Sequence, residues 1–122
     1  MAEPPAASIA VDGGDPVVGE LGSFTWQNNG SASPWLDGNP IHVGSGETLT
    51  VTLAEAVAIE TWTASRVQAT TLDGSMAVGL GEGTVDPVAF AGPPPGTWSV
   101  NVNVWFVDNL GSASYYWLIE VD

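Results

Sequence analysis

The sequence predicts an all-β protein built as an antiparallel β-sandwich. Its 15 glycines and 9 prolines are spread so evenly through the 122 residues that no window of a dozen residues combines a helical apolar repeat with freedom from helix breakers. Several short segments instead alternate apolar and polar residues with a period of two, as half-buried strands do. Because 44% of the residues are hydrophobic, the chain is apolar enough to form one core.

The clearest predicted strands form a hairpin late in the sequence. Residues 97–107 alternate without a fault, with Val102 among the positions that we expect to face the core and Trp105 among those that face outward. Residues 108–111, Asp-Asn-Leu-Gly, suit a turn. Residues 113–121 alternate again, so we expect them to pair with residues 97–107.

Earlier segments supply the other predicted strands, which are residues 8–11, 17–26, 47–53, 59–69, 76–80 and 84–91. Pro87 marks the last of these as an edge strand or a bulge, because proline cannot donate to a ladder. Residues 53–58 are the one stretch that could form a helical turn. Residues 93–96, Pro-Pro-Pro-Gly, are expected to carry the chain from one sheet to the other. The resulting count of about seven or eight strands is typical of an immunoglobulin-like sandwich.

The length of the chain predicts one domain. Residues 1–7 are rich in proline and alanine and predict a flexible tether of the kind that follows a secretion signal, which indicates an extracellular or cell-surface location. Residues 8–122 then form the single β-sandwich. No apolar run approaches the roughly 20 residues needed to cross a bilayer, so we expect no transmembrane segment.

Four short motifs carry a resemblance to a known group of proteins. They are residues 94–98 (Pro-Pro-Gly-Thr-Trp), 111–117, 19–26 (Gly-Glu-Leu-Gly-Ser-Phe-Thr-Trp) and 33–35 (Ser-Pro-Trp). The chain resembles uncharacterised bacterial secreted or lipoprotein-like domains with an immunoglobulin-like β-sandwich, in which a Leu-Gly-Ser-Tyr-Cys-Trp stretch is followed by a second cysteine. Here Thr25 and Ser31 stand at the two cysteine places, so no local disulfide can form. The resemblance implies a location and implies no activity.

The charge balance limits the partners. Fourteen carboxylates face one cation, Arg66, and the formal net charge is −13. A nucleic acid or an anionic membrane needs a basic surface, which this composition cannot supply, so we expect no nucleic-acid partner.

The residues for catalysis are sparse, and we expect a protein that is not an enzyme and has no cofactor. There is no cysteine, and His42 is the only histidine, in a loop-like segment without a nucleophile elbow. Two acids on a concave face could hydrolyse glycosides, so a small carboxylate-based hydrolase stays as the least favoured alternative.

Short acidic segments leave weak calcium binding open. Asp12 and Asp15, then Asp37, then Asp73 lie in glycine-containing loops whose oxygens could hold a hard cation. Asp-Gly is also the ordinary turn dipeptide, and a turn is the favoured interpretation of each segment.

A set of aromatic and apolar residues predicts the binding surface. Trp105, Tyr116 and Leu118 lie on the face opposite the core stripe of the hairpin, and Trp35 lies in a Pro-Trp loop. Together they would form an outer patch that stacks on a polysaccharide or anchors a protein. Alternatively, the hairpin residues are covered by the N-terminal segment or by the loop around Trp35.

These observations rank three functions. The first is a non-catalytic extracellular or cell-surface module for adhesion, assembly or partner display. The second is a carbohydrate-binding module with an exposed aromatic platform, and the third is the small hydrolase. The oligomeric state is left open.

Overall fold

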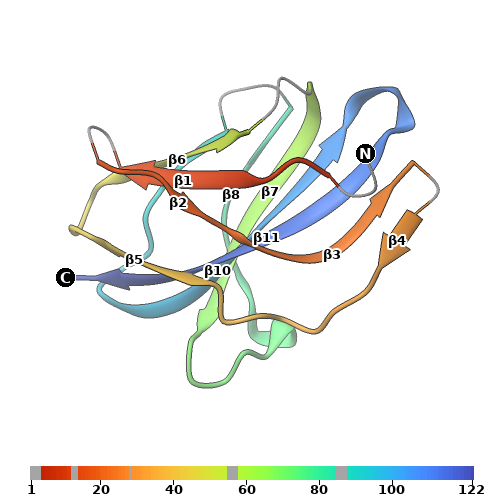
Figure 1. Cartoon of the computed structure of the whole chain (residues 1–122). Helices are drawn as coiled ribbons and strands as arrows, with labels where there is room; N and C mark the ends of the chain where they lie inside the picture. The colour runs from red at the N-terminus through yellow and green to blue at the C-terminus, as the bar shows by residue number, and fades with distance from the viewer. Residues whose placement is uncertain (1–3, 12–13, 28, 55–57, 85–87) are drawn as a thin grey trace.

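The protein is an all-β structure of two sheets that face each other across one core, as the computed structural model in Figure 1 shows. The structure describes residues 4–11, 14–27, 29–54, 58–84 and 88–122. Its strands are β1 (Ala7–Val11), β2 (Val17–Val18), β3 (Glu20–Trp26), β4 (Asn29–Ser31), β5 (Asn39–Val43), β6 (Thr48–Leu53), β7 (Ile59–Gln68), β8 (Val78–Gly83), β9 (Val88–Ala91), β10 (Gly96–Phe106) and β11 (Gly111–Val121). Two short 3₁₀ turns, η1 (Gly74–Met76) and η2 (Val107–Asn109), complete the elements.

The smaller sheet has the order β2-β1-β6-β9, and the larger has the order β4-β3-β11-β10-β7-β8. Strand β5 adds to the larger sheet by pairing with β11, and this pairing is parallel, whereas all the others are antiparallel. The predicted all-β fold with two antiparallel sheets is therefore confirmed, apart from this one strand. The described part of the chain contains no helix that is long and apolar enough to cross a membrane.

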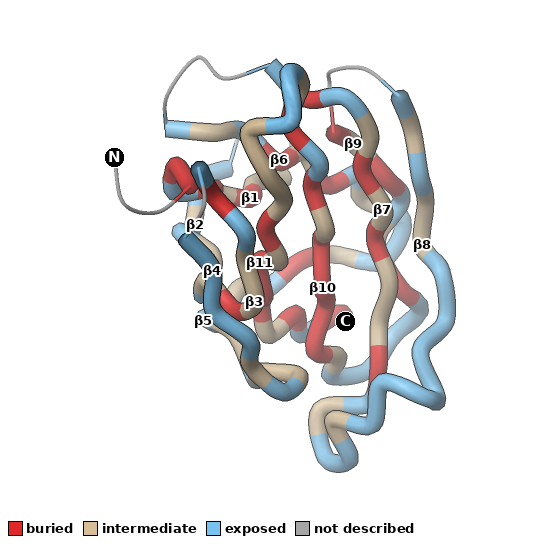
Figure 2. Tube along the Cα trace, turned by 90° about the vertical axis from the view of Figure 1, so that its right-hand side faces the viewer, coloured by how far each residue is buried: buried red, intermediate tan, exposed pale blue. Residues whose placement is uncertain are grey.

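The core lies between the sheets and is built by the predicted alternation. Val102 on β10 is fully buried, and its partners in register are Ala64 on β7 and Tyr115 on β11. Figure 2 shows buried positions running along β10 through the middle of the molecule. The fully buried side chains of the larger sheet include Val100, Val102, Val104, Trp117 and Ile119, and those of the smaller sheet include Ile9, Leu49 and Val88.

The predicted C-terminal hairpin is confirmed. Strands β10 and β11 pair from Gly96↔Val121 to Trp105↔Ser112. At the turn, Asp108 and Asn109 have positive φ angles of 58° and 55°, which short polar side chains tolerate better than most. Gly111 follows with a φ of 139°, and a Cβ there would lie 1.8 Å from the carbonyl oxygen of Thr25, so only glycine fits.

The prediction that residues 93–96 join the two sheets is also confirmed, because β9 belongs to the smaller sheet and β10 to the larger. Pro87 and residues 55–57 lie outside the described residues, so the predicted edge position and most of the predicted helical turn do too. Leu53 is the last residue of β6.

The prediction of seven or eight strands is wrong, because eleven strands are present in the described part of the chain. Residues 17–26 divide into two strands. Strand β4 is only 3 residues long and fully exposed, so it has no alternation to detect. Strand β5 contains Pro40 and pairs in parallel with the end of β11, a tertiary contact without a local sequence signal.

The N-terminal segment lies against the sandwich from residue 4 onward. The sequence places residues 4–7 in the tether, whereas in the structure Pro4 and Pro5 are buried and Ala7 begins β1. The hydroxyl of Tyr115 donates a hydrogen bond to the carbonyl of Pro5 at 2.5 Å. This buried bond ties the start of the described chain to the centre of β11.

Candidate binding face

The face of the larger sheet that points away from the core carries the predicted ligand residues. We call it the outer face. Alternation along β10 and β11 places Trp105, Tyr116 and Leu118 on it, opposite to the buried stripe that contains Val102. The loop between β4 and β5, residues 32–38, brings Trp35 to the same face.

The loop around Trp35 covers one half of the outer face. Trp35 donates from Nε1 to the hydroxyl of Ser99 at 2.8 Å, and that hydroxyl donates in turn to the carbonyl of Leu36 at 2.5 Å. The Trp35 ring meets Tyr116 edge-on, with ring centroids 5.6 Å apart. Ser99 is fully buried and Tyr116 is buried, so these residues act as part of the fold.

Burial has an electrostatic consequence for Tyr116. It raises the pKa of the Tyr116 hydroxyl above its ordinary value, because the phenolate would lose its hydration beneath the loop. Covering by the loop was one of the two alternatives for this residue, and it describes what the structure shows. Tyr116 is therefore not available for stacking on a ligand.

Trp105 and Tyr116 do not lie side by side. Trp105 pairs with Ser112, and Tyr116 pairs with Asn101. Positions 101 and 105 are four residues apart on β10, which corresponds to about 14 Å at the usual rise of an antiparallel strand. The expectation of one continuous aromatic patch is wrong for this reason. The centre of the predicted turn could have revealed the register, because it determines which residues face each other.

Leu118 lies at the covered end of the outer face. It pairs with Ser99 on one side and with Pro40 on the other, and it is half-buried. It lines a small cavity of about 150 Å³ together with His42 and Glu120. Of the four predicted ligand residues, Trp105 alone is left on an uncovered part of the sheet.

The uncovered half of the outer face is polar around Trp105. We call it the open face, and it consists of Thr25, Thr61, Thr63, Glu82, Asn103, Trp105, Ser112 and Ser114, all of which are partly or fully exposed. Register places them in two rows that cross the strands, Thr25–Ser112–Trp105–Thr61 and Ser114–Asn103–Thr63–Glu82. The Ser114 hydroxyl donates to Oδ1 of Asn103, which leaves the amide nitrogen of Asn103 as a donor for a ligand.

A cavity of about 560 Å³ opens beside Trp105. Its wall includes Thr61, Thr63 and the exposed carboxylates of Glu60 and Glu82. Trp105 is 41% exposed, which is the largest exposure of any described tryptophan. The volume falls within the range of about 300–1,000 Å³ that is common for ligand sites.

The polar residues that line this cavity were not predicted from the sequence. Thr61 and Thr63 alternate with the buried Trp62 and Ala64 on β7. This alternation alone indicates that the two threonines face outward. Their proximity to Trp105 depends on the pairing of β7 with β10, which joins segments far apart in the sequence. No local pattern indicates that pairing.

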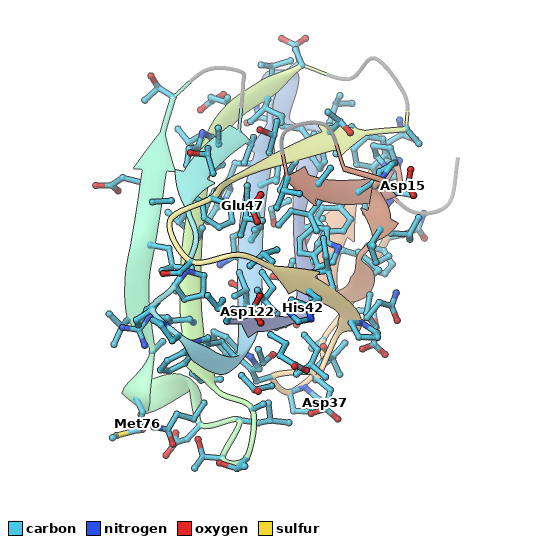
Figure 3. All side chains as sticks on the ribbon, turned by 90° about the vertical axis from the view of Figure 1, so that its left-hand side faces the viewer. Asp15, Asp37, His42, Glu47, Met76 and Asp122 are labelled. Carbon is cyan, nitrogen blue, oxygen red and sulfur yellow. The ribbon has the colours of Figure 1, made fainter. Side chains whose placement is uncertain are left out.

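The predicted calcium residues that the structure describes do not gather into a site. Asp15 and Asp37 are exposed and lie on separate parts of the molecule in Figure 3, while Asp12 lies outside the described residues. Asp73 accepts from the backbone nitrogen and the hydroxyl of Ser75 at 3.0 and 2.7 Å, and these bonds lower the pKa of its carboxyl. Among the residues that the structure describes, no group of three or more His, Cys, Asp or Glu could hold a metal ion.

His42 forms an exposed surface pair. Its Nε2 lies 2.6 Å from Oδ1 of Asp122, and Figure 3 shows the two side chains meeting where β5 runs beside β11. Within the described ranges, no serine or threonine hydroxyl forms a hydrogen bond with His42. The pair therefore lacks the nucleophile that a catalytic triad requires.

In comparisons with known proteins, no family model and no curated protein sequence matches this chain.

Proposed function

We propose that the chain is a non-catalytic, immunoglobulin-like module of an extracellular or cell-surface protein, and that its open face binds a neutral polysaccharide. The observation that carries the proposal is Trp105, 41% exposed at the edge of a cavity on a polar sheet face. Two facing sheets and a chain that crosses between them at residues 93–96 support the immunoglobulin-like part. The location is supported by the resemblance to secreted bacterial domains.

Trp105 supplies the stacking surface. Pyranose rings present an apolar face of C–H groups, and an exposed indole ring is flat enough to stack on it. Because the tryptophan side chain has only two rotatable bonds, it loses little conformational entropy when a sugar binds. Its neighbours in register, Thr61 and Ser112, place a hydroxyl on each side of the ring. Sugar hydroxyls can donate to and accept from such groups, so the surface offers both stacking and orientation.

The charges around the cavity favour a neutral sugar. Glu60 and Glu82 line it, and no lysine or arginine belongs to the open face. With a net charge of −13, the protein would repel a uronic acid polymer or a sulfated glycan. Uncharged polysaccharides avoid this repulsion and can use the two carboxylates as acceptors.

The same two carboxylates favour binding over hydrolysis. The general acid of a glycosidase is held protonated by an apolar or buried setting, and Glu60 and Glu82 are both exposed. A module that holds a polysaccharide without cleaving it serves adhesion, which is the function that we assign to the chain.

Affinity electrophoresis in native gels that contain soluble neutral polysaccharides, such as β-glucan, xyloglucan, galactomannan or starch, tests the proposal. At least one polymer should retard the wild-type protein. Trp105→Ala should weaken the retardation at least tenfold, and Thr63→Val should weaken it several-fold, because it removes one hydroxyl at similar volume. Val18→Ser, an exposed position on the smaller sheet, is the matched control and should leave it unchanged.

Two results would count against the proposal. Retardation of Trp105→Ala equal to that of wild type would move the site away from the open face. Retardation by none of the polymers would reject a neutral polysaccharide as the ligand and would favour a protein partner at this surface.

A further inference from the structure

Another large cavity lies apart from the open face, at the other end of β10. Its volume is about 470 Å³, and it lies beside the loop between β7 and β8 that extends below the sheets in Figure 1. Its lining includes Arg66, Gln68, Asp73, Met76, Val78 and Trp98. Trp98 and Trp105 stand near opposite ends of β10, so this cavity does not depend on the polysaccharide site.

Arg66 is the only lysine or arginine in the sequence. A guanidinium carries five N–H donors. Within the described residues the Arg66 side chain forms neither a hydrogen bond nor an ion pair, although the chain has 14 acids. Its Nε is buried and has no partner there. No acid in the described residues neutralises the guanidinium, so a bound anion can pair with it.

The guanidinium lies against an aromatic ring. Its central carbon lies 4.2 Å from the centroid of the Trp98 ring, a cation–π distance. The ring itself is fixed, because Trp98 donates from Nε1 to the carbonyl of Pro94 at 2.8 Å. Gly96 has a φ of 140°, and a Cβ there would lie 3.2 Å from Nε1 of Trp98. The crossing segment between the sheets therefore sets the platform on which Arg66 rests.

Asp73 lines the same cavity without neutralising Arg66. Its Oδ1 accepts two hydrogen bonds from Ser75 at the start of η1, and these bonds keep the carboxylate turned to its own loop. The acid is thus engaged in a local turn while the guanidinium remains available.

Exposed apolar side chains stand beside this cation. Met76 is 69% exposed and Val78 is 48% exposed, and both line the cavity. Figure 3 shows Met76 at the lower end of the molecule, with its sulfur directed away from the ribbon. An unpaired cation next to an uncovered apolar rim matches a ligand that has one anionic group and an apolar body.

We propose that this cavity binds small amphiphilic carboxylates. The carboxylate accepts hydrogen bonds from the guanidinium of Arg66, and the hydrocarbon part lies against Met76 and Val78. The net charge of −13 limits the site to ligands with a single charge, because repulsion from the rest of the surface is screened only beyond about 8 Å at physiological salt. Polyanions would meet this repulsion at every additional group.

The presence of one arginine makes a direct test possible. In a ¹H–¹⁵N spectrum of the labelled protein, the arginine Nε–H region contains a single cross-peak, which belongs to Arg66. Titration with sodium hexanoate should move this peak in a saturable way, with a dissociation constant of about 1 mM, as expected for a ligand of this size. Sodium chloride at matched ionic strength and 1-hexanol should each leave the peak in place.

Variants separate the two halves of the site. Met76→Ser keeps Arg66 and should weaken hexanoate binding at least fivefold. Val18→Ser, at an exposed apolar position on the smaller sheet, should leave the dissociation constant unchanged. Arg66→Gln should abolish the hexanoate-induced shift of the Met76 methyl signal, and its backbone spectrum reports whether it folds.

Three results would overturn the proposal. They are an Arg66 peak that does not respond to 20 mM hexanoate, an equal response to sodium chloride, and unchanged hexanoate affinity in Met76→Ser. The last of these results applies even if Arg66→Gln fails to fold.

Discussion

Trp105 and Val102 lie three positions apart on β10 and face opposite sides of the larger sheet, so substitutions at the two positions should have different effects. Val102 is fully buried between Ala64 and Tyr115, whereas Trp105 is 41% exposed beside a cavity. We predict that Val102→Asp prevents folding and that Trp105→Ala yields a folded protein with a moderate loss of stability.

The size of the Trp105→Ala effect follows from its burial. With 41% exposed, 59% of the side chain is covered, which is about 150 Å² of a total near 250 Å². An alanine would keep about 50 Å² of that contact, so about 100 Å² of apolar surface is lost. At about 25 cal/mol per Å², the loss is about 2.5 kcal/mol. The vacated space opens to solvent, so no enclosed cavity adds to this value.

Val102→Asp acts through charge. An unpaired carboxylate in a site without water costs several kcal/mol, and the total stability of a domain is about 5–15 kcal/mol. Urea unfolding followed by far-ultraviolet circular dichroism measures both variants without relying on tryptophan fluorescence. For Trp105→Ala, a slope of about 2 kcal/mol per molar urea gives a midpoint that falls by about 1 M.

A loss above about 4 kcal/mol for Trp105→Ala would show that the ring is packed as a core residue, and the open face would then lose its anchor. A cooperative transition in Val102→Asp at the wild-type midpoint would show that position 102 is not in the core, which would refute the alternation argument for β10.

Two further predictions concern pH and calcium. Burial raises the pKa of Tyr115, so the folded state retains a proton that the unfolded state releases near pH 10; this stabilisation is complete below about pH 10 and is lost as pH rises toward the folded pKa. The melting temperature of wild type should therefore fall between pH 9 and pH 12 more steeply than that of Tyr115→Phe, and parallel curves would contradict this. Millimolar calcium should raise the melting temperature by only a few degrees, and a rise above about 10 °C that a chelator reverses would show a tight site.

The parts of the fold that sequence could predict are those with local signals. Alternation on residues 97–107 gives the faces of β10, and the Asp-Asn pair gives the turn because both residues accept positive φ. Strand β5 has no comparable signal. It pairs with residues 117–121 of β11, a contact between segments far apart in the sequence.

The binding residues also differ in whether a local sequence pattern could reveal their positions. Strand alternation alone predicts that Trp105 lies on the outer face. The other residues that line its cavity lie on β7 and β8, and they are near Trp105 because β7 pairs with β10 and β8 pairs with β7. Arg66 was visible in the sequence as a lone cation. Its position on the Trp98 ring required the pairing of β7 with β10, which places Gln68 opposite Trp98 and Arg66 opposite Val100.

The Trp35 loop explains why the two halves of the outer face differ in exposure to solvent. Ser99 is polar and fully buried, and the loop satisfies its hydroxyl from both directions, so this half is closed by specific hydrogen bonds. The half that contains Trp105 has no such cover within the described chain, and its threonines and serines remain exposed to solvent. The fold does not need a tryptophan on a solvated polar face, because a threonine would continue the row of β-branched and hydroxyl residues and would expose less apolar surface. The large exposed indole is therefore best explained by a partner that covers it, and the open face is where we place that partner.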